Sequence, residues 1–141
     1  MKILLDLMAL SSETIPKHLT FYLKGVINMT INELNKTYYF HDSLLDNIEI
    51  NRDSSTVVLT IDFCFWVQTG YKESDPETGI IKLSFSGVEL FPELEGDLDS
   101  YSILNTSCTD DGTWTVVALD DETDICYSII IKANDVNFIC E

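Results

Sequence analysis

The segment that most constrains the fold is the long apolar stretch of residues 56–68. Its odd-numbered positions form one continuous apolar face, which consists of Val57, Leu59, Ile61, Phe63, Phe65 and Val67. Its even-numbered positions are mixed and include Asp62 and Trp66. Such alternation is typical of a strand with one buried face, because successive side chains of a strand point to opposite sides. The sequence therefore predicts a long strand that other elements must cover.

The chain from residue 44 onward predicts further strands, separated by short polar turns. The turn clusters occupy residues 51–55, 73–79, 109–112 and 120–124, and the third contains Asp111-Gly112, a strong hairpin pattern. The expected strands are one that ends at Ile50, then 80–88, 101–108, 113–119, 125–133 and 136–140, with 93–100 as an acidic loop that holds at most one helical turn. Short connections join antiparallel strands. The predicted fold is therefore β-rich α+β, with a curled antiparallel meander that forms a sandwich or a partial barrel.

The N-terminal part of the chain has helical patterns. Apolar residues at helical spacing predict a helix over 14–24 that ends near Gly25, and Thr30 with Glu33 fits a capping box for a short helical turn. The length of 141 residues suits one domain. We expect a single domain over 1–141, with a helical N-terminal segment over 1–37 and an antiparallel β domain over 38–141.

The net charge is −16, from 24 acidic and 8 basic side chains. This balance disfavours binding to nucleic acids and to anionic membranes, since both attract positive charge. It favours a basic protein as the partner. The apolar run at 3–10 is too short to span a bilayer and has no clear cleavage site, so the sequence predicts a soluble cytoplasmic protein.

The cysteines and histidines do not have the spacing of a metal site. Cys64, Cys108, Cys126 and Cys140 form no C-x-x-C pair, and His18 and His41 lie far apart in the sequence. We therefore expect no metal, no cofactor and reduced cysteines, although a Cys108–Cys126 bridge between neighbouring strands stays open as an alternative.

The sequence contains no recognisable catalytic set. His41-Asp42 lacks the additional ligands of a metal-dependent phosphohydrolase, and no Gly-x-Ser-x-Gly motif occurs. We predict instead that Asp42 or Ser43 bonds backbone amides at a strand entry, and that Phe40 anchors this corner in the core. No catalytic residue is assigned, and enzyme activity is kept only as an alternative.

The candidate binding surface consists of His41, Asp42, Asp62, Trp66 and Trp114. The large aromatic residues near acidic loops can form a protein-binding patch, although they can equally belong to the core or be half-buried in the sheet; they are Trp66, Trp114, Tyr71, Tyr101 and Tyr127. The preferred hypothesis is a protein-binding domain for a basic partner. One alternative is a small-ligand site or an active site lined by Asp62, Trp66 and His41. Another is a self-associating module that forms homo-oligomers through exposed apolar edge strands.

One segment order resembles a known kind of protein. The order is Phe40-His41-Asp42-Ser43-Leu44-Leu45-x-x-Ile48, a turn, the long apolar strand, then Leu83-x-Phe85-x-Gly87-Val88 and a closing meander. It is similar to small uncharacterised bacterial proteins, some of which look like immunity proteins encoded beside polymorphic toxins. The resemblance covers roughly residues 38–133 and leaves residues 1–28 outside. It implies a single-domain, non-enzymatic, β-rich protein, and it assigns no functional residues.

Overall fold

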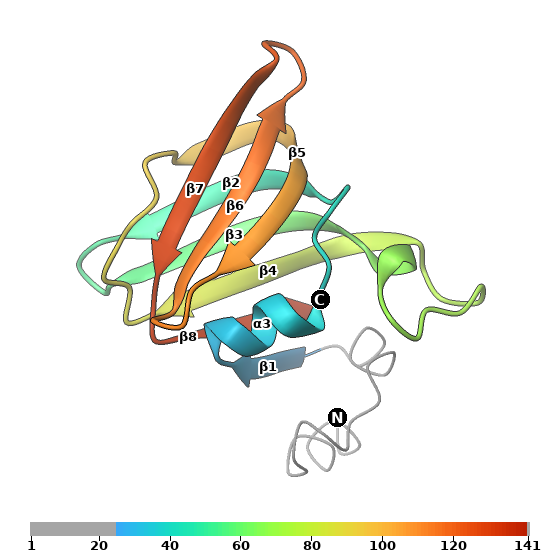
Figure 1. Ribbon diagram of the computed structural model, residues 1–141, viewed down its shortest axis with the longest axis horizontal. Helices are drawn as coiled ribbons and strands as arrows, with labels where there is room; N and C mark the ends of the chain where they lie inside the picture. The colour runs from blue at the N-terminus through green and yellow to red at the C-terminus, as the bar shows by residue number, and fades with distance from the viewer. Residues whose placement is uncertain (1–24, 141) are drawn as a thin grey trace.

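The computed structural model describes residues 25–140, which form a single antiparallel sheet of eight strands. The elements are β1 (Gly25–Met29), α3 (Ile31–Thr37), β2 (Leu44–Asn51), β3 (Thr56–Cys64), the 3-10 turn η2 (Phe65–Val67), β4 (Thr78–Ser86), β5 (Gly96–Cys108), β6 (Thr113–Asp120), β7 (Ile125–Lys132) and β8 (Asp135–Cys140). The strand order is β1-β8-β4-β3-β2-β5-β6-β7, so the sheet is open, with β1 and β7 at its edges (Figure 1). The prediction of a β-rich antiparallel fold is confirmed.

The sheet is strongly curled. Trp114 on β6 and Phe85 on β4 have their ring centroids 5.6 Å apart. Three strands lie between β4 and β6 in the strand order, and in a flat sheet four spacings of about 4.8 Å would separate the two strands by roughly 19 Å. The sheet therefore bends until the inner faces of its two halves meet, as Figure 1 shows for β5, β6 and β7.

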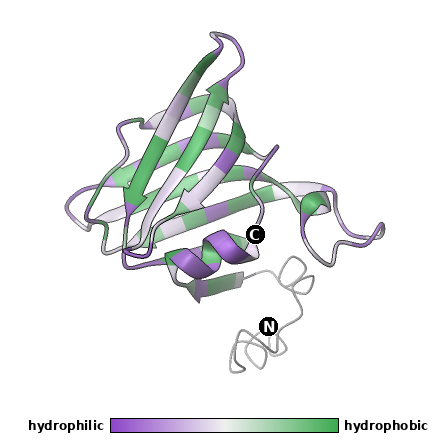
Figure 2. Ribbon diagram, in the orientation of Figure 1, coloured by the Kyte–Doolittle hydropathy of each residue, from purple (hydrophilic) through white to green (hydrophobic). Residues whose placement is uncertain are grey.

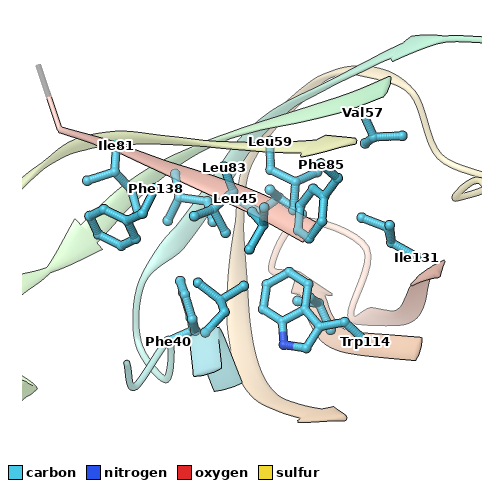
Figure 3. Close-up of a cluster of buried hydrophobic side chains, with 14 of the residues drawn as sticks. Phe40, Leu45, Val57, Leu59, Ile81, Leu83, Phe85, Trp114, Ile131 and Phe138 are labelled. Carbon is cyan, nitrogen blue, oxygen red and sulfur yellow. The ribbon is translucent and has the colours of Figure 1, made fainter. Parts of the chain in front are cut away.

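The inner face of the curl is the hydrophobic core. On β3, the odd-numbered side chains are fully buried, as the alternation predicts; they are Val57, Leu59, Ile61 and Phe63. Side chains of β2, β4, β6, β7 and β8 point at them from the other strands of the sheet (Figure 3). Because each buried branched or aromatic side chain contributes about 1.5–3 kcal/mol, this face is the main source of stability.

The short helix α3 lies across one end of the curl, beside β1 (Figure 1). Its start is the predicted capping box: the Thr30 hydroxyl accepts from the Glu33 N–H at 3.1 Å, and the Glu33 carboxylate accepts from the Thr30 N–H at 3.0 Å. On the helix, the Asn35 side-chain oxygen accepts a hydrogen bond from the Trp114 indole N–H at 3.1 Å. The helix therefore satisfies the polar atom of the largest core side chain.

The N-terminal boundary differs from the sequence prediction. The helix expected over 14–24 lies outside the described residues, whereas 25–29, which we expected to follow a helix, form β1 and pair with β8. Val26 and Ile27 are β-branched, which favours strands, and β8 offers them a free edge. Long-range pairing, not local spacing, decides the structure of this segment.

The acidic stretch before residue 101 also differs from the prediction. It was expected to be a loop, but β5 already begins at Gly96. Asp99 and Ser100 adopt left-handed backbone conformations, with φ of 52° and 63°, and the register with β2 shifts at this point. Leu98, which lies within this irregular stretch, is buried. A bulge of this kind admits polar residues into a strand because its extra residues leave the ladder.

The hairpin predicted at Asp111-Gly112 is present between β5 and β6. Gly112 has a φ of 84°, which a residue without a Cβ adopts readily. The Asp111 carboxylate accepts hydrogen bonds from the Thr109 hydroxyl and from the Thr113 N–H. These two bonds lower the pKa of Asp111 to about 2, and Lys132 assists.

All four cysteines are free. Cys108 lies opposite Trp114 on β6, while Cys126 lies opposite Leu119, five positions further along the same strand. At about 3.3 Å per residue, the two Cα atoms are roughly 16 Å or more apart, well beyond the reach of a disulfide. The alternative of a Cys108–Cys126 bridge is therefore wrong.

The positions of Cys64 and Cys126 predict different reactivities for their thiols. Burial raises the pKa of the Cys64 thiol, and the carboxylates of Asp42 and Asp62 add to this effect. Cys126 is exposed. Because the thiolate is the reactive form, we expect Cys126 to react with Ellman's reagent at pH 7–8 at least tenfold faster than Cys64. Absorbance measured on Cys126→Ser and Cys64→Ser variants tests this, and equal rates for the two thiols would contradict the buried position of Cys64.

Candidate functional site

An open hollow lies on the connection between β3 and β4. In Figure 1 this connection is the green helical turn η2 and the loop that follows it. The hollow's described lining consists of Trp66, Tyr71, Glu73 and Glu77, and its volume is about 470 Å³. We call these four residues the aromatic–acidic hollow. Trp66 is 50% exposed, which is unusual for the largest apolar side chain. Two aromatic rings and two carboxylates around one open space are suited to receive a cation.

The hollow is formed by a loop that the rest of the fold holds in place. The strand predicted to continue through Val67 ends at Cys64, because Phe65 and Trp66 turn away into η2. Their N–H groups both donate to the Glu77 carbonyl, at 2.8 and 3.2 Å. Trp66 and Glu77 are therefore held next to each other by the backbone.

Gln68 is the main brace beneath this loop. It is buried, and its side-chain NH₂ group donates to the carbonyls of Tyr39 and Cys64 at 2.6 and 2.9 Å. Its side-chain oxygen accepts from the Tyr39 N–H at 2.9 Å. One side chain thus bonds two separate segments, and a buried amide satisfied in this way rigidifies its surroundings.

A second brace fixes the far side of the hollow. The buried carboxylate of Asp75 accepts from the Lys72 N–H at 2.9 Å, and the Tyr71 hydroxyl donates to the Asp75 carbonyl at 3.2 Å. Lys72 is the one basic residue of the segment 65–77, and it is not among the described lining residues. The backbone of the loop that bears the hollow is therefore held by side-chain hydrogen bonds on both sides.

The electrostatic setting of the hollow is strongly negative. The chain outside 25–140 has three acidic and three basic residues, which cancel, so the described part carries the whole formal charge of −16. A cationic group therefore approaches the hollow through a field of favourable sign.

The predicted residues His41 and Asp42 lie at an exposed corner. The His41 Nδ1 and the Asp42 Oδ1 are 3.1 Å apart, and both side chains are more than half exposed. We expected Asp42 or Ser43 to bond a backbone amide at this corner. Ser43 does so, because its buried hydroxyl accepts a hydrogen bond from the Cys64 N–H at 2.9 Å. Phe40 is buried in the core, as predicted.

Two other predicted surface residues occupy different environments. Asp62 lies on the outer face of β3, opposite Leu44 and Ile80, and is not in the described lining of the hollow. Trp114 is completely buried between Phe40 and Phe85. This corrects the expectation for Trp114, because its inward position on β6 directs the ring into the core. Of the five candidate residues, only Trp66 belongs to the hollow.

Of the other three lining residues, Tyr71 was expected among the aromatic residues near acidic loops, whereas Glu73 and Glu77 were not singled out from the sequence. The sequence places Tyr71, Glu73 and Glu77 within eleven positions of Trp66, in the loop between two predicted strands. The pattern that the sequence offers is an aromatic residue near the end of a predicted strand, followed by a loop with an aromatic residue and several acidic residues. It is weak evidence by itself, because the sequence does not say that the loop folds back onto Trp66.

A second aromatic pair lies at the other half of the sheet. The rings of Tyr101 and Tyr127 stack, with centroids 5.6 Å apart and an interplanar angle of 12°. Burial and the nearby Asp120 raise the pKa of Tyr101. Both rings are half-buried and pack against each other, so this pair presents less free ring surface than Trp66 does.

No family model matches this chain. No curated protein and no solved structure matches it either. Within residues 25–140, no three His, Cys, Asp or Glu side chains are grouped as they would be to hold a metal ion. None of the helices in that range has the length and apolar content needed to cross a membrane.

Proposed function

We propose that this protein is an acidic protein-binding domain, and that the aromatic–acidic hollow receives a lysine or arginine side chain of a basic partner. The observation that carries this proposal is the convergence of Trp66, Tyr71, Glu73 and Glu77 on one open space. An ammonium or guanidinium group gains from the faces of the rings and from charge-assisted hydrogen bonds to the carboxylates. The braces at Gln68 and Asp75 reduce the entropy lost on binding, because they order the loop in advance.

The energetics require more than the hollow. A cation on an exposed aromatic ring contributes about 0.5–1 kcal/mol, and an exposed carboxylate about 0–1 kcal/mol. These contributions give specificity for one basic side chain but not a tight complex. The charge of −16 supplies the remainder in this proposal, because it attracts a basic surface and raises the association rate.

The resemblance to immunity-like bacterial proteins agrees with this role. A protein of that kind acts by covering a partner and needs no catalytic residues of its own. In this proposal the protein works in the cytoplasm, where its four cysteines stay reduced.

A small cationic ligand is the second candidate. The volume of about 470 Å³ lies within the range of small-molecule sites, which favours this alternative. Free arginine and tetramethylammonium distinguish the two, because a small-ligand site binds them nearly as well as a peptide, whereas a protein-binding site needs the extended chain.

The test is a titration of the full chain with an oligo-arginine peptide, in which calorimetry measures the affinity. We expect Trp66→Leu, and separately the double variant Glu73→Gln/Glu77→Gln, to weaken binding about two- to fivefold, which corresponds to about 0.5–1 kcal/mol. The matched control is Glu93→Gln/Glu95→Gln, which removes the same charge from another exposed stretch and is expected to weaken binding less than twofold. Raising the salt from about 50 to about 300 mM weakens binding in every case.

Equal losses in the two double variants would overturn the assignment of the hollow, since the peptide would then respond only to total charge. Affinity that does not depend on salt would remove the electrostatic part of the proposal.

A further inference from the structure

The outer edge of β7 carries backbone groups that have no partner within residues 25–140. At its end, the Lys132 N–H donates to the Leu90 carbonyl at 3.1 Å, and the Lys132 carbonyl accepts from the Glu89 N–H at 2.8 Å. Backbone groups of a strand alternate between its two sides. The N–H and C=O groups of Cys126, Ser128 and Ile130 therefore also point away from β6, as those of Lys132 do.

This edge lacks the features that usually protect an edge strand. The stretch 125–131 contains no charged residue and no proline, in a chain in which charged residues make up 23%. Its register with β6 runs from Thr113 to Asp120 without a bulge. Figure 2 shows hydrophobic colour toward both ends of β7, and Ile125 and Ile130 are 48% and 38% exposed. A regular, uncharged edge of this kind is a template for another strand.

We propose that β7 pairs antiparallel with β7 of a second copy of this chain, about a two-fold axis at Ser128. In this register, Ser128 lies opposite its own counterpart, and Cys126 lies opposite Ile130 of the second copy. Each of the three residues with free backbone groups then both donates and accepts one hydrogen bond. The two sheets become one continuous sheet, and the contact is closed, as two-fold pairing requires.

Other registers leave backbone groups unpaired. An axis at Tyr127 places Cys126 opposite Ser128 and leaves Ile130 opposite Asp124, beyond the end of the strand. An axis at Ile129 requires the backbone of Lys132, which Leu90 already occupies. The axis at Ser128 is the one that uses all of the free groups.

The end of β7 at Lys132 limits how far the pairing can extend. The paired stretch ends before Lys132, because the antiparallel bridge between Leu90 and Lys132 occupies that position on the edge. Lys132 also lies 3.3 Å from Glu89 and 3.8 Å from Asp111 of its own chain, so its charge is already paired there. A basic partner would find no carboxylate between Ile125 and Ile131, which makes a second copy the better fit for this edge.

The dimer must overcome the repulsion between two domains that each carry a charge of −16. Added salt screens that repulsion, so the dimer is expected to strengthen with salt. A basic partner bound at the hollow shows the opposite dependence. The two proposals are therefore separable in one set of buffers.

The test is sedimentation of the full chain over a wide range of concentration, at about 50 and about 300 mM salt. We expect a monomer–dimer equilibrium that shifts toward dimer at the higher salt. Ser128→Lys places two ammonium groups opposite each other, since hydrogen-bonded pairs have Cα atoms about 5.5 Å apart, and should weaken dimerisation at least tenfold. Ser128→Pro removes an outward N–H without touching the ladder to β6 and should do the same.

The matched control is Ser84→Lys, which adds the same charge on the outer face of the central strand β4 and should leave dimerisation unchanged or slightly stronger. Circular dichroism confirms that each variant is folded. A chain that stays monomeric at every concentration and salt overturns the proposal, as does a Ser128→Lys variant that dimerises like wild type. Glu73→Gln/Glu77→Gln should leave the dimer intact, so failure of the hollow proposal would not affect this result.

Discussion

Replacing Trp114 with alanine is expected to destabilise the protein by about 3–5 kcal/mol, the largest single effect that the structure predicts. The side chain is completely buried and contacts Phe40 and Phe85, so its removal leaves a large cavity where the two halves of the sheet meet. It also removes the hydrogen bond from the indole N–H to Asn35. Urea unfolding followed by far-UV circular dichroism measures the change.

The other tryptophan provides the control for this experiment. Trp66→Ala removes a side chain of the same size that is 50% exposed, and it should change stability by less than about 1 kcal/mol. Trp114→Phe keeps an aromatic ring and loses the hydrogen bond, so its effect should fall between the two. If Trp114→Ala does not fold, Trp114→Phe carries the test. Equal effects of Trp66→Ala and Trp114→Ala would contradict the packing of β6 against β4.

Replacing Gln68 with leucine is expected to destabilise the protein by about 2–4 kcal/mol and also to impair binding. The change leaves the N–H and C=O of Tyr39 and the C=O of Cys64 without their partner. Each buried polar group that loses its hydrogen bond costs about 1–3 kcal/mol, with the lower values where water can enter. Because Gln68 supports the loop that bears Trp66, the affinity for the oligo-arginine peptide should fall with the stability.

Thr69→Val is the matched control for Gln68→Leu. Thr69 is the next residue and is exposed, so its replacement should change stability by less than about 0.5 kcal/mol. Thermal unfolding and calorimetry on both variants provide the two measurements. A Gln68→Leu variant that unfolds and binds like wild type would show that the loop does not depend on this brace.

The sequence predicts those parts of the fold that local patterns determine. The alternation along β3, the capping box at Thr30 and the hairpin at Gly112 each depend on residues close together in the chain, and each is present in the structure. The fate of Val26 and Ile27 depends instead on β8, more than a hundred residues away. Local spacing cannot contain that information, and the same holds for the bulge at Asp99, which is set by the register with β2.

The candidate site was predictable only in part, for a similar reason. Trp66 and Trp114 both occupy even-numbered positions near predicted strands, yet one lies in an exposed turn and the other in the core. What separates them is the end of β3 at Cys64, which the Glu77 carbonyl helps to fix by accepting from Phe65 and Trp66. Tyr71, Glu73 and Glu77 approach Trp66 only because of that reversal.

The curl has one more consequence for recognition. An eight-stranded sheet rolled this far can enclose a lumen that holds one small hydrophobic molecule. In this protein, rings of its own, among them Phe63, Phe138 and Trp114, occupy that interior. In the proposed binding role, recognition is therefore left to the rim and the exterior of the sheet, where charge and surface shape, and not enclosure, would distinguish one partner from another.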